Sequence, residues 1–169
     1  ESADQTDETI EQCIDENAVQ PTVQNSDKAS DKIIALEILQ ADGKFSREIA
    51  LPGANLWSPE APNLYTCRVT FGEDIQEENF GIRVVSCTPE EGFCINGKRV
   101  LLKGGCIHHD NGLLGACAYE FAERRKIRIL LDAGYNAIRS AHNPCSKALF
   151  RACDEMGMLV MDEYIDGWY

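Results

Sequence analysis

Histidines, carboxylates and an arginine gather at three points in the second half of the chain, each directly after a short apolar run. Where such runs are parallel strands, their carboxyl ends form one rim, and ligands bind at that rim. The sequence therefore predicts a single ligand site built from all three groups. The groups are His108, His109 and Asp110; Arg139, Ser140, His142 and Asn143; and Asp162, Glu163 and Asp166.

A metal centre is the first alternative for the histidine group. Adjacent residues on an extended chain point to opposite sides, so His108, His109 and Asp110 do not converge on one ion by spacing alone. The eight cysteines form no Cys-x-x-Cys pair, so a structural zinc site has little support. We therefore expect no metal site, with Asp110 bonding within its loop or contacting the ligand.

Alternating strand and helix patterns after residue 88 position these groups. The apolar stripes have helical spacing in two segments, and short β-rich runs precede the polar groups. Ser146 is the predicted N-cap of the second helix, and Gly134 and Gly157 are placed to end the two helices. This order is β-α-β-α-β and favours a parallel sheet. The predicted helices span 119–133 and 147–156, and the predicted strands after them span 135–139 and 158–161.

The first half of the chain has only strand patterns, separated by turn residues. This organisation predicts an antiparallel β-sandwich over residues 1–87 and a separate α/β domain over 88–169. An Asn96-Gly97 turn predicts a hairpin at the start of the second domain. Residues 1–25 are expected to contain strand fragments at best. The predicted strands are 32–39, 44–49, 64–71 and 78–85, with the hairpin strands at 93–95 and 98–102.

Charge and cysteine content limit the partners and the compartment. The net charge is −12, which argues against nucleic acid as a partner, and residues 1–31 hold nine acidic residues against one basic residue. No apolar run approaches the ~20 residues of a membrane helix. The irregularly spaced cysteines are expected to be free thiols in a reducing compartment, so the bacterial cytoplasm is favoured over secretion.

Several stretches resemble glycoside hydrolase family 2, the β-galactosidase and β-glucuronidase group. The strongest are Asn136-Ala-Ile-Arg-Ser-Ala-His-Asn-Pro144 and Cys153-Asp-Glu-Met-Gly-Met-Leu-Val160. Asn143 stands where the family more often has Tyr, a variant similar to a subset of β-galactosidase-like members. Leu56-Trp-Ser-Pro-Glu-Ala-Pro-Asn-Leu-Tyr65 and Phe80-Gly-Ile-Arg83 resemble the family's immunoglobulin-like domain. Lys103-Gly-Gly-x-x-His108 resembles the start of its barrel.

The resemblance implies a fold and marks what the chain does not contain. It implies an immunoglobulin-like β-sandwich followed by about the first three strands of a TIM barrel, which needs eight βα units in ~250 residues. The family's acid/base Glu, in an Asn-Glu pair, and its nucleophile Glu have no counterpart after residue 100 and are expected beyond Tyr169. The chain alone is therefore expected to be inactive, and residues 88–169 are expected either to be partly disordered in isolation or to self-associate through the incomplete barrel.

The resemblance also implies substrate-binding roles. His142 and His108 are expected in the sugar pocket, and Arg139 is expected to pair with a carboxylate near the active centre. Adjacent side chains diverge on a strand, so Asp162 and Glu163 are not the catalytic pair, which lies ~5–5.5 Å apart in retaining enzymes. The expected substrate-binding residues are His108, His142, Arg139, Asn143, Glu163, Asp110 and Trp168, and Trp57 is expected to be an inter-domain or core aromatic residue.

Three functions remain as hypotheses. The favoured one is a segment of a retaining exo-β-glycosidase, with β-galactosidase as the favoured activity and terminal β-galactosides or related carbohydrates as substrates in carbohydrate catabolism. It needs no cofactor, although a divalent cation is an option in the parent enzyme. The second is a non-catalytic sandwich module that binds sugar or a partner chain. The third is a metal-dependent hydrolase built on His108, His109 and His142, which predicts zinc uptake and inhibition by chelators.

Overall fold

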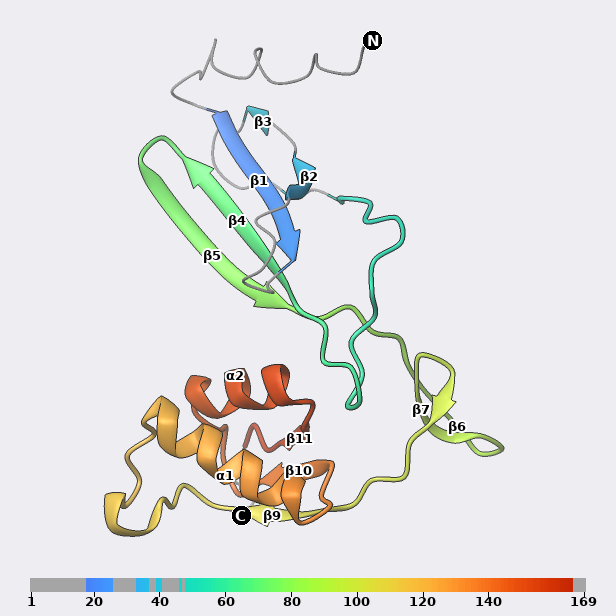
Figure 1. The fold of residues 1–169 in the computed structure, drawn as a ribbon, viewed down its shortest axis with the longest axis vertical. Helices are drawn as coiled ribbons and strands as arrows, with labels where there is room; N and C mark the ends of the chain where they lie inside the picture. The colour runs from blue at the N-terminus through green and yellow to red at the C-terminus, as the bar shows by residue number, and fades with distance from the viewer. Residues whose placement is uncertain (1–17, 26–32, 37–38, 41–45, 47, 166–169) are drawn as a thin grey trace, which may run out of the picture. The chain divides into compact units, whose positions relative to one another are not determined.

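The computed structural model describes residues 18–25, 33–36, 39–40, 46 and 48–165. The chain divides into two compact units (Figure 1). Unit 1 consists of residues 1–52 and 65–79, and unit 2 of residues 53–64 and 80–169. Segment 53–64, which precedes strand β4 in the sequence, thus belongs to the same unit as the helices. No described helix has the length and apolar character needed to cross a membrane.

Unit 1 is built on one antiparallel sheet with the strand order β2-β1-β4-β5, and β3 also pairs with β1. β4 pairs with β1 along its whole length, from Phe71 opposite Val19 to Tyr65 opposite Asn25. The expectation of strand fragments at best before residue 25 is therefore wrong, because β1 is an eight-residue strand inside this sheet. The strands are β1 (Ala18–Asn25), β2 (Ile33–Leu36), β3 (Leu39–Gln40), β4 (Tyr65–Phe71) and β5 (Asp74–Phe80).

The predicted strand 78–85 is wrong as one element. β5 ends at Phe80, and the next strand, β6 (Val85–Thr88), belongs to a different sheet. Between them the chain passes Trp57: the Trp57 amide donates to the Ile82 carbonyl at 2.7 Å, and a Cβ on Gly81 would lie 2.9 Å from the Trp57 Cβ. Half of the predicted strand 44–49 falls outside the described residues, and the other half, Ser46, Glu48 and Ile49, is not in a strand.

The first sheet of unit 2 is antiparallel and consists of β6, β7 (Gly92–Ile95) and β8 (Lys98–Arg99). The predicted hairpin is confirmed. Asn96 and Gly97 both have positive φ, 53° and 74°, as a tight type I′ turn requires. The second hairpin strand is shorter than the predicted 98–102, because the pairing stops at Arg99.

The predicted β-α-β-α-β order is confirmed in unit 2, but its first strand, β9 (Gly104–Ile107), was not predicted, since the expected strand 98–102 lies in the hairpin sheet instead. β9, β10 (Ala137–Ser140) and β11 (Leu159–Asp162) form a parallel sheet in the order β11-β10-β9, and no closed barrel is seen over the described residues. Its helices are α1 (Glu120–Asp132) and α2 (Lys147–Met156), and a short 3-10 turn, η1 (Gly112–Leu114), follows β9.

The ends of α2 follow the predicted signals. The Ser146 hydroxyl accepts the Leu149 amide at 3.1 Å, which is the N-cap contact that typically contributes ~1 kcal/mol. Gly157 ends the helix in the left-handed region at φ 81°, where a residue without Cβ is favoured.

Two apolar clusters lie on the two faces of the parallel sheet. The first lies between the sheet and the helices and includes Ile127, Ile138 and Cys153, each no more than 2% exposed. The second covers the amino ends of β10 and β11 with residues from segment 53–64 and the hairpin. Trp57 belongs to it and is 3% exposed, so the expectation of a core aromatic is confirmed. Members of the second cluster are Trp57, Leu64, Ile95, Ala137 and Leu159.

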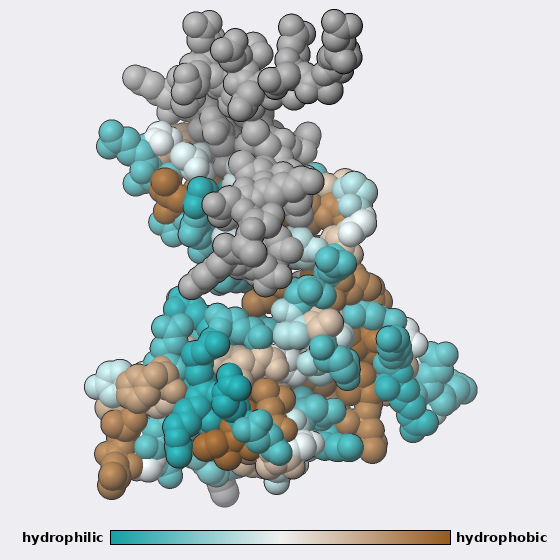
Figure 2. All heavy atoms as spheres, in the orientation of Figure 1, coloured by the Kyte–Doolittle hydropathy of each residue, from teal (hydrophilic) through white to brown (hydrophobic). Residues whose placement is uncertain are grey.

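Some apolar side chains of unit 2 remain in contact with solvent. In Figure 2 they gather at the lower left over the η1 turn, where Leu113 is fully exposed. Met161, on β11, is 60% exposed at the carboxyl side of the sheet. The carboxyl half of this sheet face is therefore open to solvent, and Arg139, which stands opposite Met161, lies on it.

Candidate functional site

Glu163 is the centre of the polar cluster at the carboxyl ends of the strands. Its Oε1 forms an ion pair with the Arg139 guanidinium, and its Oε2 lies 3.1 Å from His142 Nδ1. The Glu163 side chain is 18% exposed, so this carboxylate is largely withdrawn from water. The structure therefore brings together three of the residues singled out from the sequence, and gives Arg139 the carboxylate partner expected for it.

Strand register explains why Glu163, and not Asp162, joins this cluster. Arg139 of β10 stands opposite Cys106 and Met161, and Ser140 stands opposite Asp162. Because side chains alternate along a strand, the residue after Asp162 returns to the face of Arg139. Asp162 points the other way, where its Oδ1 accepts the Cys145 amide at 3.1 Å just before α2.

The two adjacent histidines after β9 make different contacts with the loop after β10. The His108 ring packs edge-on against the His142 ring, with the centroids 5.7 Å apart. His109 Nε2 lies 2.5 Å from Asn143 Oδ1. The Asn143 carbonyl in turn accepts the Ser140 hydroxyl at 2.9 Å. His108 thus adjoins the Glu163 cluster through His142, whereas His109 and Asn143 tie the two loops together.

Arg139 has a second partner that the sequence did not indicate. Its Nη1 lies 3.5 Å from Cys106 Sγ on the neighbouring strand. Hydrogen bonding to Cys106 and to Glu163, together with the negative charge of Glu163, raises the pKa of the Arg139 guanidinium above its ordinary value. The guanidinium therefore stays charged, and its pairing with the carboxylate is a charge-assisted contact.

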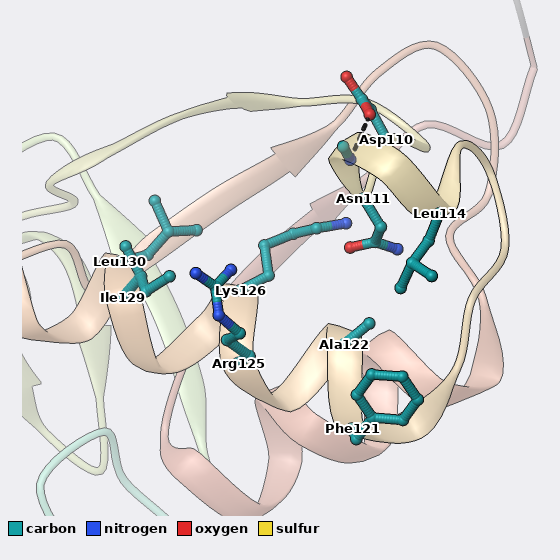
Figure 3. A pocket seen from close by; sticks show the side chains of 10 residues that line it. Asp110, Asn111, Leu114, Phe121, Ala122, Arg125, Lys126, Ile129 and Leu130 are labelled. Atoms are coloured by element: carbon teal, nitrogen blue, oxygen red, sulfur yellow. Dashed lines mark hydrogen bonds between the residues drawn. The ribbon is translucent and has the colours of Figure 1, made fainter.

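Asp110 lies apart from these contacts. Its Oδ1 accepts the Gly112 amide at 2.8 Å, and the residue lines a hollow of about 290 Å³ between the η1 turn and α1 (Figure 3). Phe121, Arg125 and Lys126 of α1 line the opposite side of this hollow. Asp110 therefore bonds within its own loop, one of the two roles expected for it.

Trp168 and Asp166 lie outside the described residues. Over the residues that the structure does describe, no group of three His, Cys, Asp or Glu side chains could hold a metal ion. Sequence reasoning missed Cys106, the His109–Asn143 contact and the buried Glu123 of α1. Strand register could have indicated Cys106, because it stands opposite Arg139. The helical spacing could have indicated Glu123, because it lies four residues before Ile127 and seven before Leu130, on the apolar face of the helix.

Two family models match the chain over nearly its whole length. Residues 2–83 match the model described as glycosyl hydrolases family 2, and residues 87–166 match the model of the glycosyl hydrolases family 2 TIM barrel domain. The matched ranges follow one another in the chain. They include every residue of the polar cluster around Glu163.

Individual proteins show the same likeness. The chain is 37% identical over 129 residues to a β-galactosidase of Bacteroides ovatus, covering 73% of this chain and 15% of that enzyme. A solved glycosyl hydrolase family 2 member from Bacteroides cellulosilyticus shares 39% identity at a TM-score of 0.72, over 88% of this chain and 20% of the other. A solved Parabacteroides merdae β-glucuronidase shares 30% identity at a TM-score of 0.74, over 87% of this chain and 19% of that one. The chain thus spans a small part of the length of its relatives.

Proposed function

We propose, from the premise that this chain belongs to glycosyl hydrolase family 2, that it is a segment of a retaining exo-β-glycosidase and supplies part of its sugar-binding pocket. The observation that carries the proposal is the convergence of Arg139 and His142 on Glu163 at the carboxyl ends of parallel strands. In a barrel enzyme this rim is where substrates bind.

The cluster can position a sugar without itself breaking the glycosidic bond. The Glu163 carboxylate lies between the Arg139 guanidinium and the His142 imidazole. These two contacts hold both of its oxygens in one orientation, so it presents acceptors in fixed directions. When His142 Nδ1 carries a proton, it donates to Glu163, which fixes the plane of the imidazole ring. A ring held in this way can contact a sugar hydroxyl that gains charge in the oxocarbenium-like transition state. The two catalytic carboxylates are expected outside the 169 residues.

A terminal β-galactoside is the substrate we propose, with a β-glucuronide as the second candidate. Relatives named β-galactosidase and relatives named β-glucuronidase both match the chain. A glucuronide carries a carboxylate that needs a cation in the pocket. The Arg139 guanidinium, the cation of the cluster, is already paired with Glu163, which supports a neutral sugar.

The test is turnover by the full-length protein encoded by the complete reading frame. Aryl β-galactoside and aryl β-glucuronide are compared as substrates, and the anomer released first is followed by NMR. We expect faster hydrolysis of the galactoside with retention of the β-configuration. Preference for the glucuronide would replace the proposed substrate. Inversion, or no turnover of any β-glycoside, would overturn the proposed function.

His142→Ala tests the site itself. We expect kcat/KM to fall by ~10²-fold or more, because one lost donor to a developing charge is typically worth ~2.7–4 kcal/mol in the transition state. The control is Lys147→Ala, because Lys147 is an exposed residue of α2 outside the cluster around Glu163. Wild-type kinetics for His142→Ala would show that this histidine only packs the rim.

A further inference from the structure

We infer that Glu123 is a positioning residue, whose buried carboxylate fixes the loop that presents His108. This inference rests on the proposed function, because it concerns the same sugar pocket. Glu123 is on α1 and is 4% exposed, although carboxylates are almost never buried without partners. Two partners, one from the loop and one from the helix, account for its burial.

The loop partner is Asn111. Asn111 Nδ2 donates to Glu123 Oε1 at 2.9 Å and to the Cys117 carbonyl at 3.1 Å. The backbone N–H of Asn111 donates to the Gly115 carbonyl at 2.8 Å. Asn111 therefore closes the turn through both its backbone and its side chain. The 108–119 loop is therefore folded around Asn111, and Asn111 is held to α1 by Glu123.

The helix partner is Lys126. Its Nζ lies 3.0 Å from Glu123 Oε2, one turn further along α1, and its side chain is 17% exposed. Figure 3 shows Lys126 extending from α1 toward Asn111 across the hollow. Since each carboxylate oxygen has its own donor, the Glu123 side chain is held in one direction. A partly buried ion pair of this kind is costly to break from one side, because the remaining charge is left without its partner.

The connection from this anchor to the pocket is short. The Asp110 amide donates to the His108 carbonyl at 2.8 Å, one residue before Asn111. His108 in turn contacts the His142 ring. Glu123 contacts neither His108 nor His142. It acts on the pocket only through Asn111, by fixing the position of the loop that begins at His108. Loss of the anchor should therefore change how well substrate binds more than it changes the bond-breaking step.

The first measurement is hydrogen exchange on the full-length protein. For Glu123→Ala we expect the hydrogen-bonded amides of Asn111, Gly115 and Cys117 to exchange about ten-fold faster or more, since a hydrogen bond to a charged group is lost. Glu120→Ala is the matched control, because Glu120 lies on the same helix and is exposed. Glu123→Gln keeps an oxygen that can accept from Asn111 and should restore most of the protection. Unchanged exchange in Glu123→Ala would overturn the inference.

The second measurement is kinetic and separates positioning from general stability. Glu123→Ala should raise KM by about ten-fold with a smaller change in kcat, and Asn111→Ala should do the same from the loop side while leaving α1 intact. In a His108→Ala background the effect on KM should fall below about two-fold, because the residue that Glu123 positions is gone. A KM effect of equal size in both backgrounds would overturn the inference.

The two measurements also separate this inference from the proposed function. A full-length protein that cleaves no β-glycoside would count against the proposed function alone, because hydrogen exchange still reports whether Glu123 fixes the loop. If the enzyme is active but Glu123→Ala changes neither the loop exchange rates nor KM, the inference is overturned and the proposed function is unaffected. If Glu123→Ala does not fold, Glu123→Asp carries both measurements, because it draws the carboxylate back from Asn111 and leaves the contact between Asn111 and Cys117 in place.

Discussion

Gly157→Ala should destabilise unit 2 more than an alanine at any ordinary helix end. Gly157 follows α2 with φ 81°, a conformation that L-residues adopt at a cost. It also lies directly against segment 53–64. A methyl group added at Gly157 would stand 2.2 Å from the Pro59 carbonyl oxygen and 2.9 Å from its carbonyl carbon. Both of these atoms belong to the backbone, so no side-chain rotation can relieve the overlap.

The magnitude follows from two separate costs. Placing a non-glycine residue in the left-handed region costs ~1–2 kcal/mol. Forcing a methyl group into a filled space adds ~1–3 kcal/mol. Gly134 supplies the control, because it follows α1 at φ 86° and a methyl group there would meet nothing within 4 Å. We expect a loss of ~2–5 kcal/mol for Gly157→Ala and only the first cost, ~1–2 kcal/mol, for Gly134→Ala.

Urea unfolding followed by tryptophan fluorescence can measure this difference. The chain has two tryptophans, so a Trp168→Phe background leaves Trp57, which is buried in segment 53–64, as the reporter. We expect the Trp57 transition of Gly157→Ala to move to clearly lower urea than that of Gly134→Ala. Equal shifts for the two variants would refute the reasoning, because they would show that Pro59 does not pack against Gly157.

Three further outcomes can be checked. Burial, reinforced by the charge of Asp162, raises the pKa of the Cys145 thiol from 9.0 to about 12, so the unfolded chain loses this proton first. Stability should therefore fall as pH rises from 9 toward 12, and denaturant unfolding should show a smaller fall in Cys145→Ala. In dilute monomer, amides of Leu159–Asp162 should exchange faster than those of Tyr65–Phe71, since β11 has one described neighbour and β4 has two; equal protection would contradict this. The isolated 169-residue chain should not hydrolyse aryl β-galactosides above a mock-expression control, and turnover that survives this control would contradict the expectation.

Elements with strong local signals were predictable from the sequence. The helices, the Asn96-Gly97 turn and the Ser146 cap each depend on residues close together in the chain, and all three agree with the structure. Elements that depend on distant partners were not predictable in the same way. β1 contains few signals of its own and is a strand because β4 pairs with it along its length. The interruption at Gly81 arises from Trp57, a residue 24 positions earlier in the chain.

The site was predictable in its location more than in its contacts. Polar residues at strand ends correctly placed Arg139, His142 and Glu163 near one another, and period-2 alternation separated Asp162 from Glu163. The contacts of Asp110 and His109 depend on how the loops after β9 and β10 fold, which no periodicity encodes. Burial of Glu123 depends on where the 108–119 loop returns over α1, so its charge alone gave no indication of its partners.

Unit 2 is made of two separate stretches of chain, and this has a consequence for chain entropy. The chain leaves unit 2 after Leu64 and returns to it at Phe80. The intervening excursion, residues 65–79, contains β4 and most of β5. The Thr66 hydroxyl donates to Asn79 Oδ1 at 2.7 Å and holds the two ends of this excursion together. Once the β4–β5 hairpin has formed, bringing Trp57 to Ile82 closes only a short remaining loop, and the entropic cost is lower than for an unstructured connection. A break in the chain at the Gly72 turn would remove this advantage, since Trp57 would then have to be recruited as part of a separate polypeptide.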